Sequence, residues 1–129
     1  MPLKLSLAKG ERLVVNGAVI KNDGPDTSLV FENRALILRQ KDIMTSENAN
    51  TPARRVYLAL QCAYMFPERQ PEHLETFRTM LRDFVEAAPS SAQIARSMGA
   101  CTDQGDLYGA LKECRKLIEH ETEILEHVQ

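Results

Sequence analysis

The octapeptide LVVNGAVI, residues 13–20, decides how the first third of the chain folds. Asn-Gly favours a tight type I′ turn, because both turn positions take positive φ, and the flanks are rich in β-branched residues. The pattern therefore predicts a β-hairpin that turns at Asn16 and Gly17. Upstream, apolar residues occupy alternate positions over residues 3–7, which is the period of a half-buried strand.

Two more short strands are predicted at residues 28–32 and 35–39, and the pattern then changes to helical spacing. Proline, glycine and capping residues bound four expected helices, at residues 52–66, 71–88, 90–99 and 104–128. We therefore expect an α+β fold, with a five-stranded antiparallel meander or small roll at the N-terminus covered by C-terminal helices. We expect one domain over residues 1–129, with a β-rich part at 1–45 and a helical part at 51–128.

Length and composition favour a small cytoplasmic protein. The chain has 129 residues, of which 43% are hydrophobic and 26% charged, as is ordinary for one soluble domain. Its three cysteines are an odd number without a close pair, which favours reduced thiols over a disulfide framework or a zinc site. No basic and then apolar leader opens the sequence, so we expect no export and no membrane partner.

Charge is distributed unevenly between the two parts of the chain. Residues 1–55 carry nine Lys and Arg against six Asp and Glu, whereas the whole chain has a formal net charge of −2. Nucleic-acid affinity comes largely from neutralised phosphates, so any such affinity must come from the basic first part. The uneven halves also suit a partner protein or a second copy of the chain.

Nothing in the sequence indicates catalysis, and we expect neither an enzyme, nor a cofactor, nor a metal. Gly10, Gly17 and Gly24 lie in turns between predicted strands and not between a strand and a helix, so no phosphate-cradling loop is expected. Cys62 lies in an apolar helical run, which favours a packed thiol over a nucleophile. His120 and Glu123 share a helix face near Glu119 and His127, which is either a weak metal site or a solvated charged face.

The last predicted helix has apolar residues at coiled-coil spacing, interrupted once by an acid. This seam consists of Leu107, Leu111, Cys114, Ile118, Glu121, Leu125 and Val128. It is either a packing surface or a surface for a partner.

Arg54 and Arg55 are the sharpest local feature. They follow Pro52 in the first turn of a predicted helix, where free backbone N–H groups attract anions. They either form ion pairs with Asp42 or Glu47 or bind phosphate.

Several segments together resemble the FlbT family of bacterial regulators of flagellum biosynthesis. The resemblance rests on PLKLSL (2–7), KGE (9–11), VNGAVI (15–20), FENRA (31–35), ILR (37–39), KDIM (41–44) and ANTPARRVY (49–57). It is weaker beyond residue 57, where YGAL (108–111) and RKLI (115–118) keep a similar spacing.

The resemblance implies post-transcriptional control of flagellin. Members of the family act on the 5′ untranslated leader of flagellin mRNA, affecting its translation and stability, as repressors in some bacteria and as activators in others. They work alongside the flagellar protein FlaF. The resemblance does not identify individual RNA-binding residues.

Two hypotheses follow for this chain. One is a regulator that binds the flagellin mRNA leader. The other is an adaptor of flagellar assembly that acts through flagellin or FlaF without touching RNA. From electrostatics alone, the expected RNA-binding residues are Arg54, Arg55, Arg34, Arg39, Lys41, Lys4, Lys9 and Arg12. Open strand edges and the small number of basic residues lead us to expect a homo-oligomer.

Overall fold

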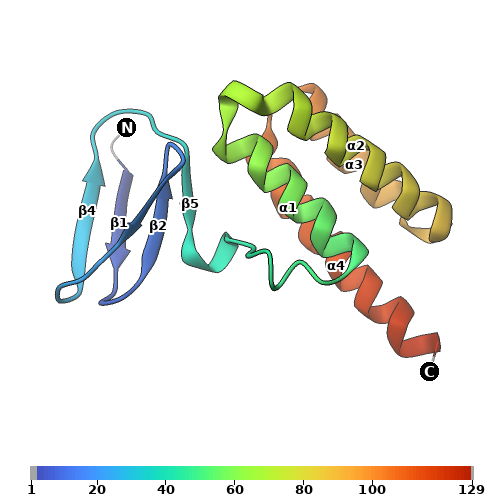
Figure 1. Cartoon of the computed structure of the whole chain (residues 1–129), viewed down its shortest axis with the longest axis horizontal. Coiled ribbons are helices and arrows are strands. Elements are labelled where there is room, and N and C mark those ends of the chain that lie inside the picture. Colours follow the sequence, from blue (N-terminus) through green and yellow to red (C-terminus); the bar gives the residue numbers. More distant parts are fainter. Residues whose placement is uncertain (1–2, 129) are drawn as a thin grey trace. The chain divides into compact units, whose positions relative to one another are not determined.

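The computed structural model describes residues 3–128 and contains five strands followed by four α-helices (Figure 1). This order confirms the predicted α+β class. The chain divides into two compact units, and the division falls between Ile43 and Met44. We call them the strand unit and the helical unit and describe each by itself. That they form one domain, with the helices covering the strands, stays a prediction.

The strand unit contains two small antiparallel sheets. In the first, β1 (Leu3–Leu7) pairs with β4 (Thr27–Phe31). In the second, the order is β3 (Ala18–Lys21), β2 (Arg12–Val15) and β5 (Ile37–Arg39). The five antiparallel strands are as predicted, but their order is not that of a meander, because only β2 and β3 are both consecutive and paired.

Apolar side chains from both sheets form the core of the strand unit. Leu5, Leu7 and Leu13 are buried, and residues of β2, β4 and β5 pack against them. Asn22 fixes the loop that leads from β3 to β4, because its Nδ2 donates to the carbonyls of Leu7 and Pro25, each at 3.0 Å. Side-chain bonds of this kind hold loops in place of a sheet ladder.

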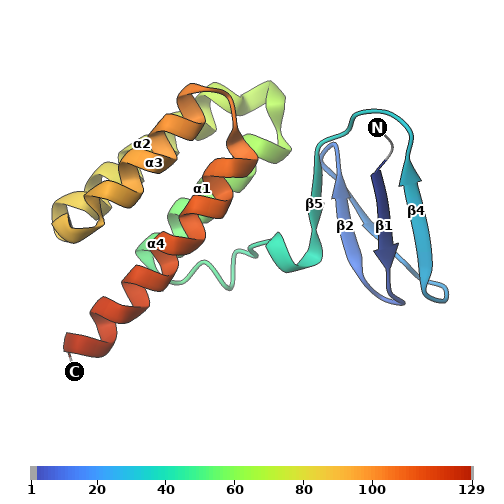
Figure 2. The ribbon, with the colours of Figure 1, turned by 180° about the vertical axis from the view of Figure 1, so that it is seen from behind.

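The helical unit consists of α1 (Pro52–Met65), α2 (Gln70–Ala87), α3 (Ala92–Asp103) and α4 (Leu107–Val128). Helix α1 packs against α2 and α4, and α3 packs against α4 (Figure 2). Helices α2 and α3 contact each other much less. Within residues 3–128, each helix falls short of the length and apolarity that a bilayer span requires.

The helical core is dense where α1 meets its neighbours. Its fully buried side chains include Val56 and Leu60 of α1, Phe77 of α2 and Leu111 of α4. Gln61, which interrupts the apolar run of α1, is also buried. It accepts from Met44 N at 2.7 Å and donates to Met44 O at 3.0 Å. The amide therefore ties the segment before α1 to the body of the helix.

The helix ends differ from the predicted ones in their chemistry. Ser90, at which the third helix was expected to begin, does not cap α3; Ser91 lies at the start of this helix, and its hydroxyl donates to Ala88 O. Helix α3 continues to Asp103, well beyond the predicted end at residue 99. Asp106 caps α4 instead, accepting from Gly109 N at 2.9 Å.

The predicted seam of α4 is only partly a packing surface. Leu107, Leu111 and Cys114 are buried as expected, but Leu125 is 53% exposed. Leu117, which the seam omits, has no exposed surface. The buried stripe drifts around the helix because 3.6 residues per turn do not fit a seven-residue repeat over this length.

Candidate nucleic-acid interface

The hairpin brings two basic side chains together at one end of the strand unit. Its two-residue turn, with φ of 51° at Asn16 and 85° at Gly17, sets the pairing so that Arg12 lies opposite Lys21. Direct cross-strand partners point to the same face of a sheet, and both side chains are exposed. Like charges in this position destabilise a sheet, whereas together they attract an anion.

Lys21 was not among the residues expected to bind RNA. The two-residue turn at Asn16 and Gly17 nevertheless fixes the register from sequence alone. Residues whose numbers are equally far from the turn must pair, which places Lys21 opposite Arg12. The equal distance of Arg12 and Lys21 from the turn is thus the sequence signal that identifies Lys21.

Two further predicted residues lie at the same end of the strand unit. The short 3₁₀ turn η1 (Gln40–Asp42) follows β5 and is fastened to the start of β2, because Arg12 N donates to Gln40 Oε1 at 2.6 Å. This bond brings exposed Lys41 close to the start of β2. Arg39, half-buried opposite Leu13, belongs to the face of the sheet that carries the core.

Acidic side chains moderate the charge at this end. Glu11 Oε1 accepts from Ala8 N and Asp26 Oδ1 accepts from Lys9 N, each at 2.8 Å. Both acids also line a hollow of about 740 Å³ together with Arg39. Arg39 and the backbone of Lys9 therefore have carboxylates near them, and the exposed basic side chains at this end include Arg12, Lys21 and Lys41. We call these three residues the basic cluster.

The structure places two predicted residues away from the basic cluster. Arg34 lies in the loop between β4 and β5, which is held against the hairpin turn because Leu36 N donates to Asn16 Oδ1 at 2.9 Å. This turn is at the opposite end of the strands (Figure 1). Lys4 is exposed on the other sheet, opposite Val30. The six expected residues that belong to the strand unit therefore do not form one patch.

Arg54 and Arg55 lie in the helical unit, and the backbone groups beside them are already occupied. Arg54 N donates to Thr51 Oγ1 at 3.2 Å, and Ala53 N donates to Glu121 Oε2 at 2.9 Å. The anion at this helix start is therefore the carboxylate of Glu121 from α4. The open amides on which the expected phosphate site was based are absent from the first turn as the structure describes it. The assignment of the two arginines to RNA stays a prediction, resting on their side chains alone.

The expected ion pairs of these arginines are also not seen within the helical unit. Over the described residues, neither arginine pairs with Glu47. Arg54 Nη1 instead contacts Asn50 Oδ1 at 3.4 Å. Arg55 lines a hollow of about 250 Å³ on α2, and Asp83 is the acid that shares it. Asp42 belongs to the strand unit.

The remaining candidate chemistry has structural roles in the described part of the chain. His120 Nε2 lies 2.8 Å from Ser90 Oγ, which links α4 to the turn before α3. Residues 3–128 bring no three His, Cys, Asp or Glu side chains together as metal ligands. Burial raises the pKa of the Cys62 thiol, which keeps it protonated at neutral pH and makes it a poor nucleophile.

Cys114 and Glu121 together fasten α4 to the start of α1. The Cys114 thiol donates to Ala53 O at a sulfur–oxygen distance of 4.0 Å, while Glu121 accepts from the N–H of the same residue. Burial raises the pKa of Cys114 far above its ordinary value, and the negative charge of Glu121 raises it further. The Cys114 thiol and the Glu121 carboxylate of the predicted seam thus both bond to the backbone of one residue of α1, Ala53.

Comparison with known proteins identifies the family. The family described as Flagellar protein FlbT matches residues 3–125. A protein of Bradyrhizobium diazoefficiens named probable flagellum biosynthesis repressor protein FlbT 1 is 42% identical over 96% of this chain and 85% of its own length. The flagellum biosynthesis repressor protein FlbT of Caulobacter vibrioides is 39% identical over 99% of this chain and 92% of its own length.

Relatives from other bacteria carry the same name. A probable flagellum biosynthesis repressor protein FlbT from Rhodopseudomonas palustris is 37% identical over 97% of this chain and 98% of its own length. No solved structure matches the chain. The match along nearly the whole sequence confirms the resemblance seen in its first half, and the chain belongs to the FlbT family of flagellar proteins.

Proposed function

We propose that this chain regulates flagellin synthesis after transcription, in the cytoplasm, by binding the 5′ untranslated leader of flagellin mRNA. A regulatory role in flagellum biosynthesis follows from the family and from the names of its members. The observation that carries RNA contact is the pair of exposed side chains Arg12 and Lys21, held side by side at a cost in sheet stability. Lys41 adds a third cation.

Phosphate contacts, rather than base stacking, are the expected mode of binding. Sheet-based RNA readers stack bases on exposed aromatic side chains, but the single aromatic residue of the strands, Phe31, packs against the core. Three contacts predict a slope of about −2 when the logarithm of the binding constant is plotted against that of the salt concentration. Such binding is weak for one copy, and two copies double the number of contacts.

The test is binding of purified protein to a flagellin leader RNA and to a scrambled RNA of equal length, measured across salt concentrations. The double variant R12E/K21E should lose at least about tenfold in affinity, because two attractions become two repulsions. The double variant R69E/K112E makes the same change of charge on exposed residues of the helical unit and is the matched control. Leader binding that survives R12E/K21E unchanged would show that the basic cluster is not the RNA surface.

Whether the RNA surface includes Arg54 and Arg55 is a separate question with its own variant. R54E/R55E places acids in the first turn of α1, where the helix dipole favours negative charge, although the carboxylate of Glu121 is already there. A loss of leader affinity at unchanged thermal stability supports a phosphate role. A lower melting temperature with normal leader binding assigns the two arginines to structure.

The adaptor hypothesis differs in one measurable respect. If the chain acts through flagellin or FlaF without touching RNA, leader and scrambled RNA bind equally weakly at every salt concentration, and R12E/K21E leaves regulation in cells unchanged. We propose that self-association accompanies RNA binding, because β3 is an edge strand with all four residues exposed. Light scattering with and without leader RNA tests this.

A further inference from the structure

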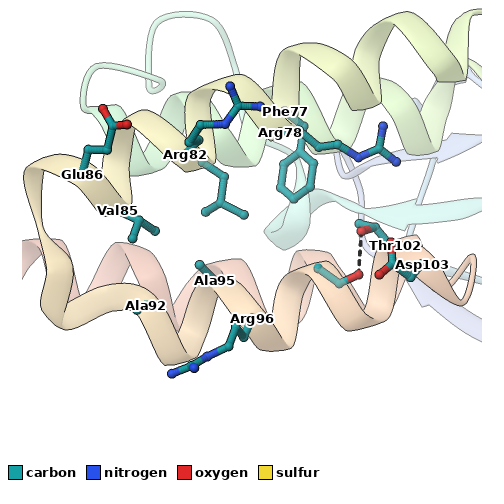
Figure 3. A pocket seen from close by; sticks show the side chains of 12 residues that line it. Phe77, Arg78, Arg82, Val85, Glu86, Ala92, Ala95, Arg96, Thr102 and Asp103 are labelled. Atoms are coloured by element: carbon teal, nitrogen blue, oxygen red, sulfur yellow. Dashed lines mark hydrogen bonds between the residues drawn. The ribbon is translucent and has the colours of Figure 1, made fainter.

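A groove runs between α2 and α3 on the helical unit. It has a volume of about 560 Å³, and its apolar lining includes Phe77, Leu81 and Val85 from α2 and Ala95 and Gly99 from α3 (Figure 3). Phe77 and Leu81 are buried and form its floor, whereas the others are half-buried. The groove exists because α3 presents small side chains to α2, and because α2 packs mainly against α1 whereas α3 packs mainly against α4.

Three arginines stand along the rims of this groove. Arg78 and Arg82 lie on the α2 side and Arg96 on the α3 side (Figure 3). All three are exposed, and within residues 3–128 none of them forms an ion pair. The two acids of the lining, Glu86 and Asp103, lie at opposite ends of the groove (Figure 3). The middle of the groove is therefore apolar at its floor and positive at both sides.

We propose that this groove binds an acidic amphipathic helix of a partner protein. A helix fits because it satisfies its own backbone hydrogen bonds, whereas an extended strand needs a free sheet edge, which two helices do not offer. Phe77 to Glu86 spans about 14 Å at 1.5 Å per residue, so the occupant is about three turns long. Its apolar stripe covers the floor, and acidic side chains at its flanks meet the arginines.

A protein occupant accounts for the groove better than RNA or a second copy does. RNA binding needs exposed aromatic faces or a polar surface, whereas the only aromatic residue of the lining, Phe77, is 1% exposed. The free end of α4 is the acidic helix that a second copy offers. Over residues 119–127 of this end, Leu125 is the one large apolar side chain that is exposed, so α4 offers a single leucine and not the apolar stripe that would cover the floor of the groove.

The probe is a synthetic, fluorescently labelled peptide helix of three turns, with a leucine stripe flanked by glutamates. A second peptide carries lysines in place of the glutamates. We expect the acidic peptide to bind one per chain, more weakly as salt rises, and the basic peptide to bind at least about tenfold more weakly. R78E/R82E should abolish this preference, and R69E/K112E should leave it unchanged.

Gly99 offers a second way to close the groove without disturbing the fold. A Cβ atom at this position meets no atom within 4 Å, so a side chain here projects into open space. Gly99→Leu should fill the groove and reduce peptide binding at least about tenfold, while Gly99→Ala, the matched control, should retain most of it. Far-UV circular dichroism checks that both variants keep their helices.

Each other outcome contradicts the proposal. Equal binding of the two peptides, no binding of either, or full binding by Gly99→Leu means that the groove does not recognise acidic helices. A dimer in light scattering that Gly99→Leu converts to monomer assigns the groove to a second copy. Leader RNA that competes with the peptide assigns it to RNA. The proposal does not depend on the basic cluster, because R12E/K21E should lose RNA and keep the peptide.

Discussion

Replacing Glu121 by alanine should destabilise the helical unit by about 2–3 kcal/mol. Glu121 is 7% exposed, and its carboxylate accepts a hydrogen bond from Ala53 N at 2.9 Å. A hydrogen bond to a charged group contributes about 1.5–3 kcal/mol, and an acid at a partly buried helix start contributes up to about 2 kcal/mol. These two values describe the same contact, so they overlap rather than add. Removing a buried charge also returns part of its desolvation cost.

Two further substitutions separate charge from shape at this position. Glu121→Gln keeps the length and an acceptor oxygen but loses the charge, so it should cost about 1 kcal/mol, because neutral hydrogen bonds contribute about half as much. Glu121→Leu restores an apolar residue to the seam but leaves the N–H of Ala53 without its acceptor. It should therefore also be less stable than the natural chain, by about 1–3 kcal/mol.

Urea unfolding followed by far-UV circular dichroism at neutral pH measures these differences. The midpoint should move and the slope should not, because the surface exposed on unfolding hardly changes. Glu123→Ala, on an exposed position of the same helix, is the control and should change stability by at most about 0.5 kcal/mol. A more stable Glu121→Leu variant would refute the reasoning, because the buried carboxylate would then cost more than its bond contributes. Equal losses for alanine and glutamine would refute the role of charge.

Three other predictions concern the sheet, the helices and alkaline pH. Arg12→Glu should stabilise the strand unit by about 0.2–1 kcal/mol, because it places an opposite charge beside Lys21, and it should weaken leader binding. In R12E/K21E the two charges are again alike, so this gain in stability should disappear. Gly99→Ala should stabilise the helical unit by about 0.5–1 kcal/mol, because alanine is the better helix former. Gly109→Ala should not stabilise it, because the added methyl group meets the carboxylate of Asp106, which caps α4. When the pH rises above about 8.5, the ordinary pKa of a thiol, the unfolded chain loses the Cys114 proton whereas the folded chain keeps it. The stability should therefore fall by up to about 1.4 kcal/mol per pH unit.

Each of these has a measurement that can contradict it. Urea unfolding of the two single glutamate variants and their double variant gives the coupling between the paired cations, and a coupling of zero would mean that they do not repel. Equal effects of the two glycine substitutions would mean that the cap of α4 contributes nothing. For the thiol, Cys114→Ala should lose less stability than the natural chain between pH 8 and pH 10, and parallel curves would exclude its contribution.

The sequence predicts local features of this fold well and distant pairings poorly. The Asn16–Gly17 turn specifies the hairpin register and therefore the position of Lys21, because two residues leave only one way to pair the flanking strands. The pairing of β1 with β4 joins segments separated by two other strands, and no turn between them sets a register. Alternation alone does not choose among such partners.

The same limit applies to polar residues in apolar patterns. Glu121 interrupts a seam in the sequence, but only the structure shows that it reaches the first turn of a helix 68 residues earlier. Gln61 similarly satisfies the backbone of Met44. In both cases the partner is a backbone group, and every residue except proline has the same N–H and C=O. Sequence therefore marks such a position as unusual without naming its partner.

The long reach of Glu121 has a consequence for how the protein is made. All strand pairings are complete by Arg39, so the strand unit has its partners early in synthesis. Helix α1 lacks its anionic cap until residue 121 has been added, which takes about 4–16 s after Ile43 at 5–20 residues per second. During that interval Arg54 and Arg55 should remain open to trypsin on ribosome-bound chains, and they should become protected once Glu121 has left the ribosome. Nascent α1 is thus secured after translation of nearly the whole chain, not as it emerges.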